Sequence, residues 1–320
     1  MTVALLDVDV LVYKACFVTG VEVDWGDGIV SKVANKKEAT DCIDVLIRQW
    51  REKARGSKYF CCLSHPENFR KNIDEKYKAN RKDKPELVDE IRKHVLDKHP
   101  TIMHPGLEAD DILGVYSGRW PGSIMVSPDK DLQSVPGILL NPDKSTRPVK
   151  ISKAQANRFW TRQILTGDST DNFHGIPGVG PKKAERILLG ASSFDEAWER
   201  IVRAYIANGL SEIDAIRNAR LARILRPEDW NPETGEIRLW HPLATNVWWT
   251  PTTKSSDHPT TTSDESKSST SPSKSADTIR ETKRRSSKTS SSTSAAPRTK
   301  GLRKKTSSKP RRTSKSSSNS

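Results

Sequence analysis

Acidic residues recur in this chain at the ends of short apolar runs. Asp7 closes the run 2–6, and further acidic residues follow the runs 101–104 and 123–126. A later pair, three residues apart, shares one face if its segment is helical. The full set is Asp7, Glu108, Asp110, Asp111, Asp129, Asp131, Asp168 and Asp171. If the runs are parallel strands, their carboxyl ends meet at one edge of a sheet, where the ligands of open α/β sheets bind.

Such a cluster of carboxylates predicts a metal site. Neighbouring carboxylates repel and raise one another's pKa, so the cluster needs a compensating cation. Oxygen ligands without a Cys or His framework suit a hard ion, Mg²⁺ or Mn²⁺. Two such ions about 3.5–4 Å apart hydrolyse phosphodiesters without a Ser or His nucleophile. Taken one pair at a time, the same residues also fit helix caps, because Asp is favoured where a helix begins.

Two basic segments offer contacts for phosphate. In the stretch 75–85, Lys78 and Arg81 can neutralise a phosphate, and Tyr77 offers a ring for base stacking. Taken alone, such a run also fits an ordinary solvated surface. The segment 175–188, GIPGVGPKKAERIL, is a glycine-rich turn before a helix. Helix N–H groups that a phosphate can approach closely form an anion site, although an ordinary turn between two helices would read the same way.

The elements that must position these residues alternate between strand and helix. Apolar runs predict strands at 2–6, 59–63, 101–104 and 123–126, and helical spacing predicts helices at 36–55, 85–99 and 109–119. This alternation predicts an α/β fold with a mostly parallel central sheet flanked by helices. Adjacent Cys61 and Cys62 would then point to opposite faces of the sheet.

The pattern changes after about residue 152. Helices are expected at 152–165, 181–189, 193–208 and 211–225, with a short strand at 231–240. Residues 251–320 contain 17 Lys/Arg, 5 Asp/Glu and no aromatic residue. They cannot bury enough apolar surface to offset the entropy of ordering and are predicted to be disordered. The expected domains are an α/β domain (1–150), a helical lobe (151–250) and a basic tail (251–320).

Composition excludes several classes of protein. No run approaches the roughly 20 apolar residues of a membrane span. The N-terminus carries Asp7 and Asp9 and lacks a basic region, unlike a secretory signal. The four cysteines form no CxxC pair, which argues against a zinc site and favours reduced thiols in a cytoplasmic protein.

The motifs, in their order, resemble the 5′-nuclease (flap endonuclease-like) superfamily, and most closely the small 5′→3′ exonucleases of short-tailed bacteriophages. LLDVDVLVYKA resembles the first-strand aspartate motif, NFRKNIDEKYKANRK the basic motif at the base of an arch, and GLEADDILG and SPDKDLQSVPG the two central acidic motifs. TGDSTDNFHGIPGVGPKKA resembles the last acidic pair and the helix–turn–helix (helix-hairpin-helix) DNA-binding loop. LARILRPEDW and GEIRLWHP resemble the C-terminal end of the phage enzymes, so the resemblance covers roughly 1–242.

The resemblance implies a PIN-like 5′-nuclease fold and a role for each motif. The first metal ion would be held by Asp7, Glu108 and either Asp110 or Asp111. The second would be held by Asp129, Asp131 and Asp171, with Asp168 bound directly or through water. Lys78 and Arg81 would grip the scissile phosphate as catalytic residues. The duplex backbone would contact Gly175, Gly178, Gly180, Lys182 and Lys183, with a K⁺ ion on the loop carbonyls.

One departure from the family concerns the first ion. Family members usually carry an Asp just after the second strand, where this chain has Ser64 or His65. His65 is either a substitute ligand or a plain loop residue. The stretch before GLEADD is also short, so an arch over the site would be small.

The resemblance implies a two-metal-ion 5′→3′ exodeoxyribonuclease that uses Mg²⁺, with Mn²⁺ as a substitute. Its substrates would be duplex or flap DNA, with RNA in RNA–DNA hybrids as a further candidate. It would serve phage DNA replication, primer removal or recombination in the host cytoplasm. One alternative is a ribonuclease of the related small PIN-like class, against which the helical lobe argues. Another is a noncatalytic DNA-binding accessory protein, against which the carboxylates argue because they repel phosphate unless metal is bound.

Overall fold

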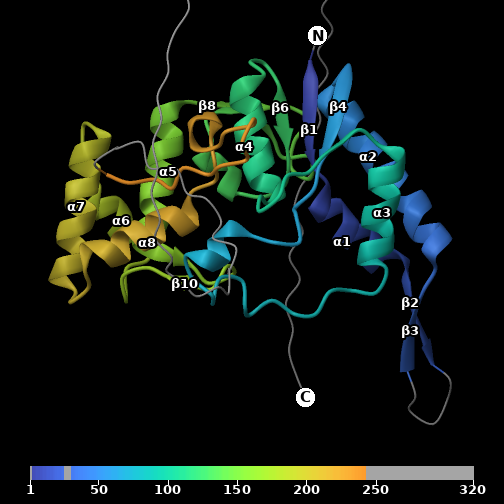
Figure 1. The fold of residues 1–320 in the computed structure, drawn as a ribbon, viewed down its shortest axis with the longest axis horizontal. Coiled ribbons are helices and arrows are strands. Elements are labelled where there is room, and N and C mark those ends of the chain that lie inside the picture. Colours follow the sequence, from blue (N-terminus) through green and yellow to red (C-terminus); the bar gives the residue numbers. More distant parts are fainter. Residues whose placement is uncertain (1, 25–29, 243–320) are drawn as a thin grey trace, which may run out of the picture. The chain divides into compact units, whose positions relative to one another are not determined.

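Strand β1 (Val3–Asp7) lies inside a six-stranded sheet with the order β5-β4-β1-β6-β7-β8 (Figure 1). The computed structural model describes residues 2–24 and 30–242. The other strands are β4 (Lys58–Cys62), β5 (Thr101–Ile102), β6 (Ile124–Val126), β7 (Gly137–Leu140) and β8 (Val149–Ile151). Every pairing in the sheet is parallel except that of β7 with β8. The predicted mostly parallel sheet is confirmed.

Helices cover both faces of this sheet, as predicted. α1 (Val8–Thr19), α2 (Lys36–Ala54) and α3 (Val88–Lys98) pack on one face, and α4 (Ala109–Arg119) packs on the other (Figure 1). Neighbouring residues of a strand point to opposite faces. Cys61 accordingly belongs to the first hydrophobic cluster and Cys62 to the second. Both thiols are free and buried.

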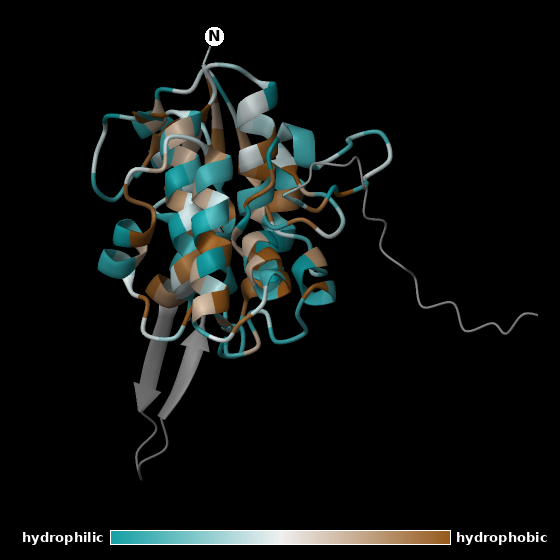
Figure 2. Cartoon of the chain, turned by 90° about the vertical axis from the view of Figure 1, so that its left-hand side faces the viewer, coloured by the Kyte–Doolittle hydropathy of each residue, from teal (hydrophilic) through white to brown (hydrophobic). Residues whose placement is uncertain are grey.

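A third hydrophobic cluster belongs to the helical lobe. The lobe contains α5 (Lys153–Thr166), α6 (Pro181–Ile187), α7 (Phe194–Ala207) and α8 (Glu212–Ala222). Figure 2 looks onto this side, where the helices carry both hydrophilic and hydrophobic residues. Their apolar stripes bury Trp160, Ile201 and Tyr205. The Tyr205 hydroxyl donates to the Ile164 carbonyl at 2.5 Å, so this buried phenol is satisfied.

The chain returns from the lobe to the α/β core. Ile224, Leu225, Trp230 and Ile237 are buried in the same cluster as the α4 side chains. A Cβ on Gly114 of α4 would lie 2.2 Å from the Leu225 carbonyl oxygen, so the returning segment lies directly on the helix backbone. The second face of the sheet is therefore completed by residues that follow the lobe in sequence.

Several details differ from the prediction. Three features were not predicted: α1, the antiparallel pair β2 (Gly20–Asp24) and β3 (Val30–Ala34), and the last two strands of the sheet, β7 and β8. Between residues 152 and 225, where only helices were expected, β9 (Gly167–Asp168) and β10 (Phe173–His174) form a hairpin, so Asp168 and Asp171 do not share a helix face.

At 231–240 the expected strand is reduced to a single bridge between Trp230 and Ile237. The predicted disordered tail, 251–320, lies outside the described residues. All described residues fall in one compact unit, and the division at residue 150 stays a prediction. Within the described part of the chain, no helix has the length and apolar character needed to cross a bilayer.

A buried arginine ties the helical lobe to the sheet. Arg70, in the short helix η1 (Phe69–Asn72), donates to both carboxylate oxygens of Asp111 on α4, at 2.7 and 2.8 Å. It also donates to the carbonyls of Leu221 and Arg223, at 3.1 and 2.7 Å. The Asp111 carboxylate further accepts from the backbone N–H of Leu225 at 3.0 Å. One ion pair thereby joins η1, α4 and the end of the lobe.

Loss of this arginine should destabilise the fold strongly. Arg70→Ala leaves the buried Asp111 carboxylate without its cation, and breaking such a pair costs about 3–5 kcal/mol of the free energy of unfolding. Arg203→Ala is the matched control, because Arg203 pairs with Glu199 on the surface and such pairs contribute within about 1 kcal/mol. Chemical denaturation of both variants measures the difference. Equal losses would contradict a central role for Arg70.

Candidate metal and phosphate site

The carboxyl edge of the sheet brings the predicted acidic residues together. Asp7 ends β1, Glu108 caps α4 after β5, and the loop after β6 supplies Asp129 and Asp131. A pocket there is lined by the carboxylates of Glu108, Asp110, Asp129, Asp131, Asp168 and Asp171. Its volume is about 160 Å³, small beside the roughly 300–1,000 Å³ of ordinary ligand pockets. It fits ions and their waters better than a buried nucleotide.

One group of these carboxylates has no protein cation bound to it. Asp7 is buried next to the pocket, where it accepts a hydrogen bond from Ser127 Oγ at 2.7 Å. Burial, together with the charges of Asp9 and Asp129, raises the pKa of Asp7 to about 7. Burial and the charges of Asp7 and Asp129 raise the pKa of Asp110 well above its usual range. Asp7 and Asp110 therefore need either protons or a bound cation, and Asp129 lies close enough to act on both through its charge.

A second group shares one lysine. Lys130 Nζ lies 3.1 Å from Asp131 Oδ1 and 3.3 Å from Asp168 Oδ2. Gln163 Nε2 on α5 donates to Asp131 Oδ1 at 2.9 Å. The pKa of Asp131 is nevertheless raised to about 6, because burial and the charge of Asp129 outweigh Lys130. Asp129 thus acts electrostatically on both groups and stands between them.

Glu108 and Asp171 are held by residues of the basic segment. Lys78 Nζ bonds Glu108 Oε1 and lies 3.7 Å from Asp171 Oδ2. The Tyr77 hydroxyl lies 3.0 Å from an oxygen of each carboxylate and can donate its proton to either one. Burial raises the pKa of Glu108, but Lys78 and Arg70 outweigh it and lower the value to about 2. Glu108 is therefore an anion over the whole physiological range.

The basic segment reaches the pocket through turns rather than a helix, and α3 begins only at Val88. Lys78 adopts a left-handed backbone conformation, with φ of 57°. Its N–H donates to the Asp171 carbonyl at 2.9 Å, and Asn172 Nδ2 donates to the Lys76 carbonyl at 2.7 Å. Arg81 Nη2 lies 3.0 Å from Asp171 Oδ1, with about half of its side chain exposed. Lys78 is thus largely buried in the pocket, whereas Arg81 lies half-exposed at the pocket opening.

The donor set fits hydrated Mg²⁺. In the described part of the chain, only Asp44, His94 and His99 bring three ligand atoms within 4.8 Å of one another. The pocket carboxylates are more widely spaced, which suits an ion that keeps several waters and binds one or two carboxylates directly. The unpaired group of Asp7, Asp110 and Asp129 is where positive charge is most needed.

Two residues singled out from the sequence have other roles. Asp111 faces away from the pocket, because its oxygens accept from Arg70, Leu225 N and Glu108 N. Of the two adjacent aspartates, it is Asp110 that lines the pocket. The Tyr77 ring is buried in the third hydrophobic cluster and cannot stack on a base.

The residues after the second strand, Ser64 and His65, do not line the pocket. His65 Nδ1 accepts the Glu67 N–H at 3.2 Å. Ser64 Oγ accepts the Ala109 N–H at 2.9 Å. The Ser64 N–H donates to Asp9 Oδ2 at 2.9 Å, and Arg92 bonds both the Asp9 carboxylate and the Ser64 carbonyl. An arginine–aspartate pair thus lies beside the position where the family usually has an Asp.

Sequence reasoning also missed three pocket residues: Arg70, Lys130 and Gln163. Arg70 lies in the motif NFRK and Lys130 in the motif SPDKD. Because both motifs had already been assigned to the site, these two residues could have been predicted from the sequence. Gln163 carried none, since only the packing of α5 against the sheet edge brings it to Asp131.

The glycines of the loop 175–180 have different functions. A Cβ on Gly175 would lie 2.2 Å from the Leu165 carbonyl oxygen, so this glycine serves internal packing. Gly178 has a φ of +71°, which favours glycine for its backbone alone. Gly180 has open space around its Cβ position, and Lys182 and Lys183 beside it are exposed. The exposed residues of the loop are Pro177, Gly178 and Gly180, and the exposed Lys182 and Lys183 follow in α6.

An acidic pocket at the carboxyl edge of a parallel sheet, with basic residues at its mouth, is the architecture of a metal-dependent nuclease. Residues 2–155 match the family model described as 5'-3' exonuclease, N-terminal resolvase-like domain. The exodeoxyribonuclease of Enterobacteria phage T3 is 24% identical and the exonuclease of Escherichia phage T7 25% identical; each alignment covers 75% of this chain and 93% of the relative.

The fold also matches a solved structure, the D15 protein of phage T5 co-crystallized with metal ions. The TM-score is 0.54 at 16% identity, over 71% of this chain and 90% of that one. The chain is thus similar to 5′→3′ exonucleases through its N-terminal domain, to phage exonucleases over most of its described length, and to the D15 protein in its fold.

The unpaired carboxylates should make metal-free stability depend on pH. A carboxyl group whose folded-state pKa exceeds its unfolded value binds more protons when folded, so stability falls as pH rises between the two values. For Asp7 this interval runs from 3.8 to about 7. The melting temperature in EDTA should therefore decrease across it, and Mg²⁺ should flatten the decrease. The lowered pKa of Glu108 acts only below 4.5 and does not interfere.

Asp7→Asn should reduce this pH dependence, because the amide carries no titrating charge. Asp97→Asn, on the exposed side of α3, is the control and should behave as the unsubstituted protein. A melting temperature that stays flat in EDTA, or that falls equally in both variants, would rule out Asp7 as the source.

Proposed function

We propose that this protein is a metal-dependent 5′→3′ nuclease that hydrolyses the phosphodiester backbone of DNA. The observation that carries the proposal is the convergence of carboxylates from three segments on one pocket with Lys78 and Arg81. The names of the phage T3 and T7 relatives, exodeoxyribonuclease and exonuclease, support it. A second T5 structure, a flap endonuclease in complex with DNA and metal ions, has the same fold at a TM-score of 0.52.

The acidic residues of the pocket would bind the metal ions, and its basic residues would bind the phosphate. A divalent ion bound there would lower the pKa of a water and stabilise the charge that develops on the phosphate. In our proposal Asp7, Asp110 and Asp129 hold one Mg²⁺, and Asp131, Asp168 and Asp171 hold a second, with Asp129 close to both. Mn²⁺ can substitute, because it prefers the same oxygen ligands.

The cations at the pocket bind the phosphate. Arg81 offers a half-exposed guanidinium at the mouth, suited to bidentate contact with phosphate oxygens. Lys78 lies deeper, where its pKa is lowered by burial but raised more strongly by Glu108 and Asp171, so it stays charged. The two residues thus present positive charge at two depths along the path to the carboxylates.

The helical lobe would hold the duplex away from the cut. The β9–β10 hairpin carries Asp168 and then runs directly into the loop 175–180. DNA bound at Gly180, Lys182 and Lys183 is therefore placed relative to the pocket by only a few residues. A K⁺ ion on the loop carbonyls belongs to the same proposal.

Flap DNA and the RNA strand of RNA–DNA hybrids are included among the proposed substrates. The proposed role is primer removal or recombination during phage DNA replication in the cytoplasm of a bacterial host. An assay with 5′-labelled duplex, flap and hybrid, with and without Mg²⁺, tests the substrate range directly.

Removal of a shared carboxylate should abolish cleavage. Asp129→Ala should lower turnover at least about a hundredfold, because several kcal/mol of charge stabilisation are lost. Duplex binding, measured in Ca²⁺, should persist because the loop and its lysines are intact. Asp143→Ala, in an exposed pair with Lys14, is the control. Near-normal turnover of Asp129→Ala in Mg²⁺ would refute the nuclease site, and a protein that binds DNA without cleaving it would support the accessory-protein alternative.

The loop should affect binding more than chemistry. Lys182→Ala should weaken duplex binding and reduce the slope of log affinity against log salt by roughly 0.9 for one lost phosphate contact. Gly180→Val should weaken binding by blocking the approach of the backbone, since Gly180 has no positive φ to confound the result. Lys98→Ala, exposed on α3, is the control. Unchanged affinity in both loop variants would show that the loop is only a structural turn.

A further inference from the structure

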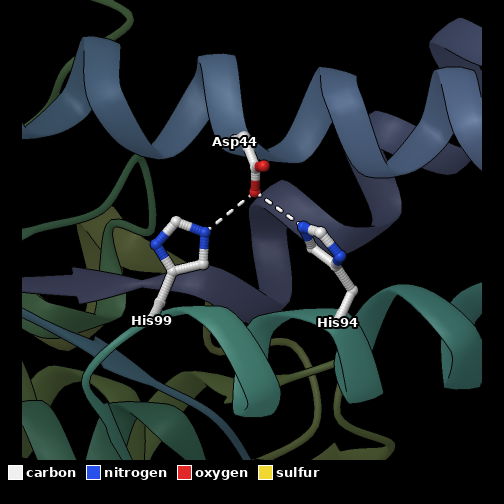
Figure 3. A group of neighbouring side chains, drawn as sticks. All are labelled: Asp44, His94 and His99. Carbon is white, nitrogen blue, oxygen red and sulfur yellow. Dashed lines mark hydrogen bonds and ion pairs between the residues drawn. The ribbon is translucent and has the colours of Figure 1, made fainter.

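A second candidate metal site lies between α2 and α3, outside the acidic pocket. Asp44 on α2 faces two histidines, His94 on α3 and His99 at its C-terminal cap (Figure 3). Both imidazole Nε2 atoms lie 2.8 Å from the same oxygen, Asp44 Oδ1. The three ligand atoms lie within 4.8 Å of one another, the closest such group in the described part of the chain.

The donor set is distinct from that of the pocket. Two imidazole nitrogens and one carboxylate oxygen suit a borderline ion such as Zn²⁺, whereas the all-oxygen pocket suits Mg²⁺. None of the three residues lines the acidic pocket. Their side chains are 41%, 21% and 12% exposed for Asp44, His94 and His99, so an ion can enter from solvent and a water can complete its coordination.

A third element supports one of the histidines. The Tyr59 hydroxyl on β4 lies 3.0 Å from His99 Nδ1, and the Arg51 guanidinium lies over the Tyr59 ring at 5.1 Å. Metal-binding histidines are usually oriented by such a partner on the other ring nitrogen. A hydroxyl can donate or accept, so it can stabilise His99 whether Nε2 carries a proton or binds an ion. The two Nε2 atoms lie 2.8 Å from Asp44 Oδ1. Bonds of about 2.0–2.2 Å to a tetrahedral ion therefore require the side chains to move apart only slightly.

The carboxylate of Asp44 is available as an anion. Burial raises its pKa, but the hydrogen bonds from His99 and His94 outweigh burial and lower it. An ion would replace the two protons shared between imidazole and carboxylate, leaving the same three side chains joined through shorter and stronger contacts.

We propose that Asp44, His94 and His99 bind a transition-metal ion of the Zn²⁺ class and that this ion fastens α3 to α2. The position gives the site a structural consequence. α3 follows the basic segment that carries Lys78 and Arg81, and its Arg92 bonds Asp9 beside the acidic pocket. An ion bound near the C-terminal end of α3 therefore stabilises the helix that directly follows the basic segment.

Zn²⁺ titration by calorimetry tests the proposal. It is run in excess Mg²⁺, which competes with Zn²⁺ for the acidic pocket, and repeated in an Asp129→Ala background, which weakens ion binding in that pocket. Asp44→Asn keeps an oxygen that accepts from both imidazoles, so the fold is preserved while the anionic ligand is lost. It should bind one Zn²⁺ fewer. Asp41→Asn, one turn away on α2 and paired with Lys37, should bind Zn²⁺ as the unsubstituted protein does.

Two further measurements separate an ion site from a hydrogen-bonded clamp. Tyr59→Phe should weaken Zn²⁺ binding about 10–100-fold, the usual effect of removing such a supporting partner. Zn²⁺ should raise the melting temperature of the unsubstituted protein and of Asp41→Asn, but not of Asp44→Asn. Equal Zn²⁺ stoichiometry in Asp44→Asn and Asp41→Asn, or no Zn²⁺ bound by the Asp129→Ala protein, would overturn the proposal and leave the cluster as a hydrogen-bonded contact between helices.

Discussion

The guanidinium of Arg70 connects the acidic edge of the sheet with the helical lobe. Removing such a charge from water is costly, and only complete pairing can offset that cost. Here the donors reach Asp111, Glu108 and two main-chain carbonyls of the lobe. The same cation helps to hold Glu108 ionised. Docking of the lobe and the charge state of a pocket residue therefore depend on one side chain.

The carboxylates of the pocket form groups that differ in which cations balance their charge. Glu108 and Asp171 are balanced by the basic segment, and Asp131 and Asp168 share Lys130. Among the described residues no lysine or arginine forms an ion pair with Asp7, Asp110 or Asp129, and the pKa values of Asp7 and Asp110 are raised. This division explains how a protein can fold around so many like charges: part of the repulsion is removed by lysine and arginine, and the rest is left for an ion.

Much of the site could be predicted because its residues follow strand ends. Parallel strands place their carboxyl ends at one edge, so Asp7, Asp129 and Asp131 meet there whatever the exact strand boundaries are. The choice between Asp110 and Asp111 could not be made, because it depends on Arg70, which is 41 residues from Asp111 in sequence. Tyr77 has a sequence context that suits base stacking, yet the lobe packs over its ring.

The same limit applies to Asp44. Its two histidines are 50 and 55 residues away, and only the packing of α2 against α3 brings them to it. Neither histidine spacing nor any cysteine pair marks that site in the sequence. Local sequence patterns therefore predicted the site residues whose position depends on one strand or helix. They did not predict the residues that are brought together by packing between distant elements.

The return of residues 224–237 to α4 has a consequence for the newly made chain. The side chains that close the second face of the sheet are synthesised after the whole helical lobe. At ~5–20 residues per second, translation from Ile151 to Ile237 takes roughly 4–17 s. During that time the side of α4 that carries Gly114 and Gly118 lacks the segment that packs on it. A chain that ends within the lobe would lack this cover permanently, so it should be a better substrate for chaperones and proteases than the full-length protein.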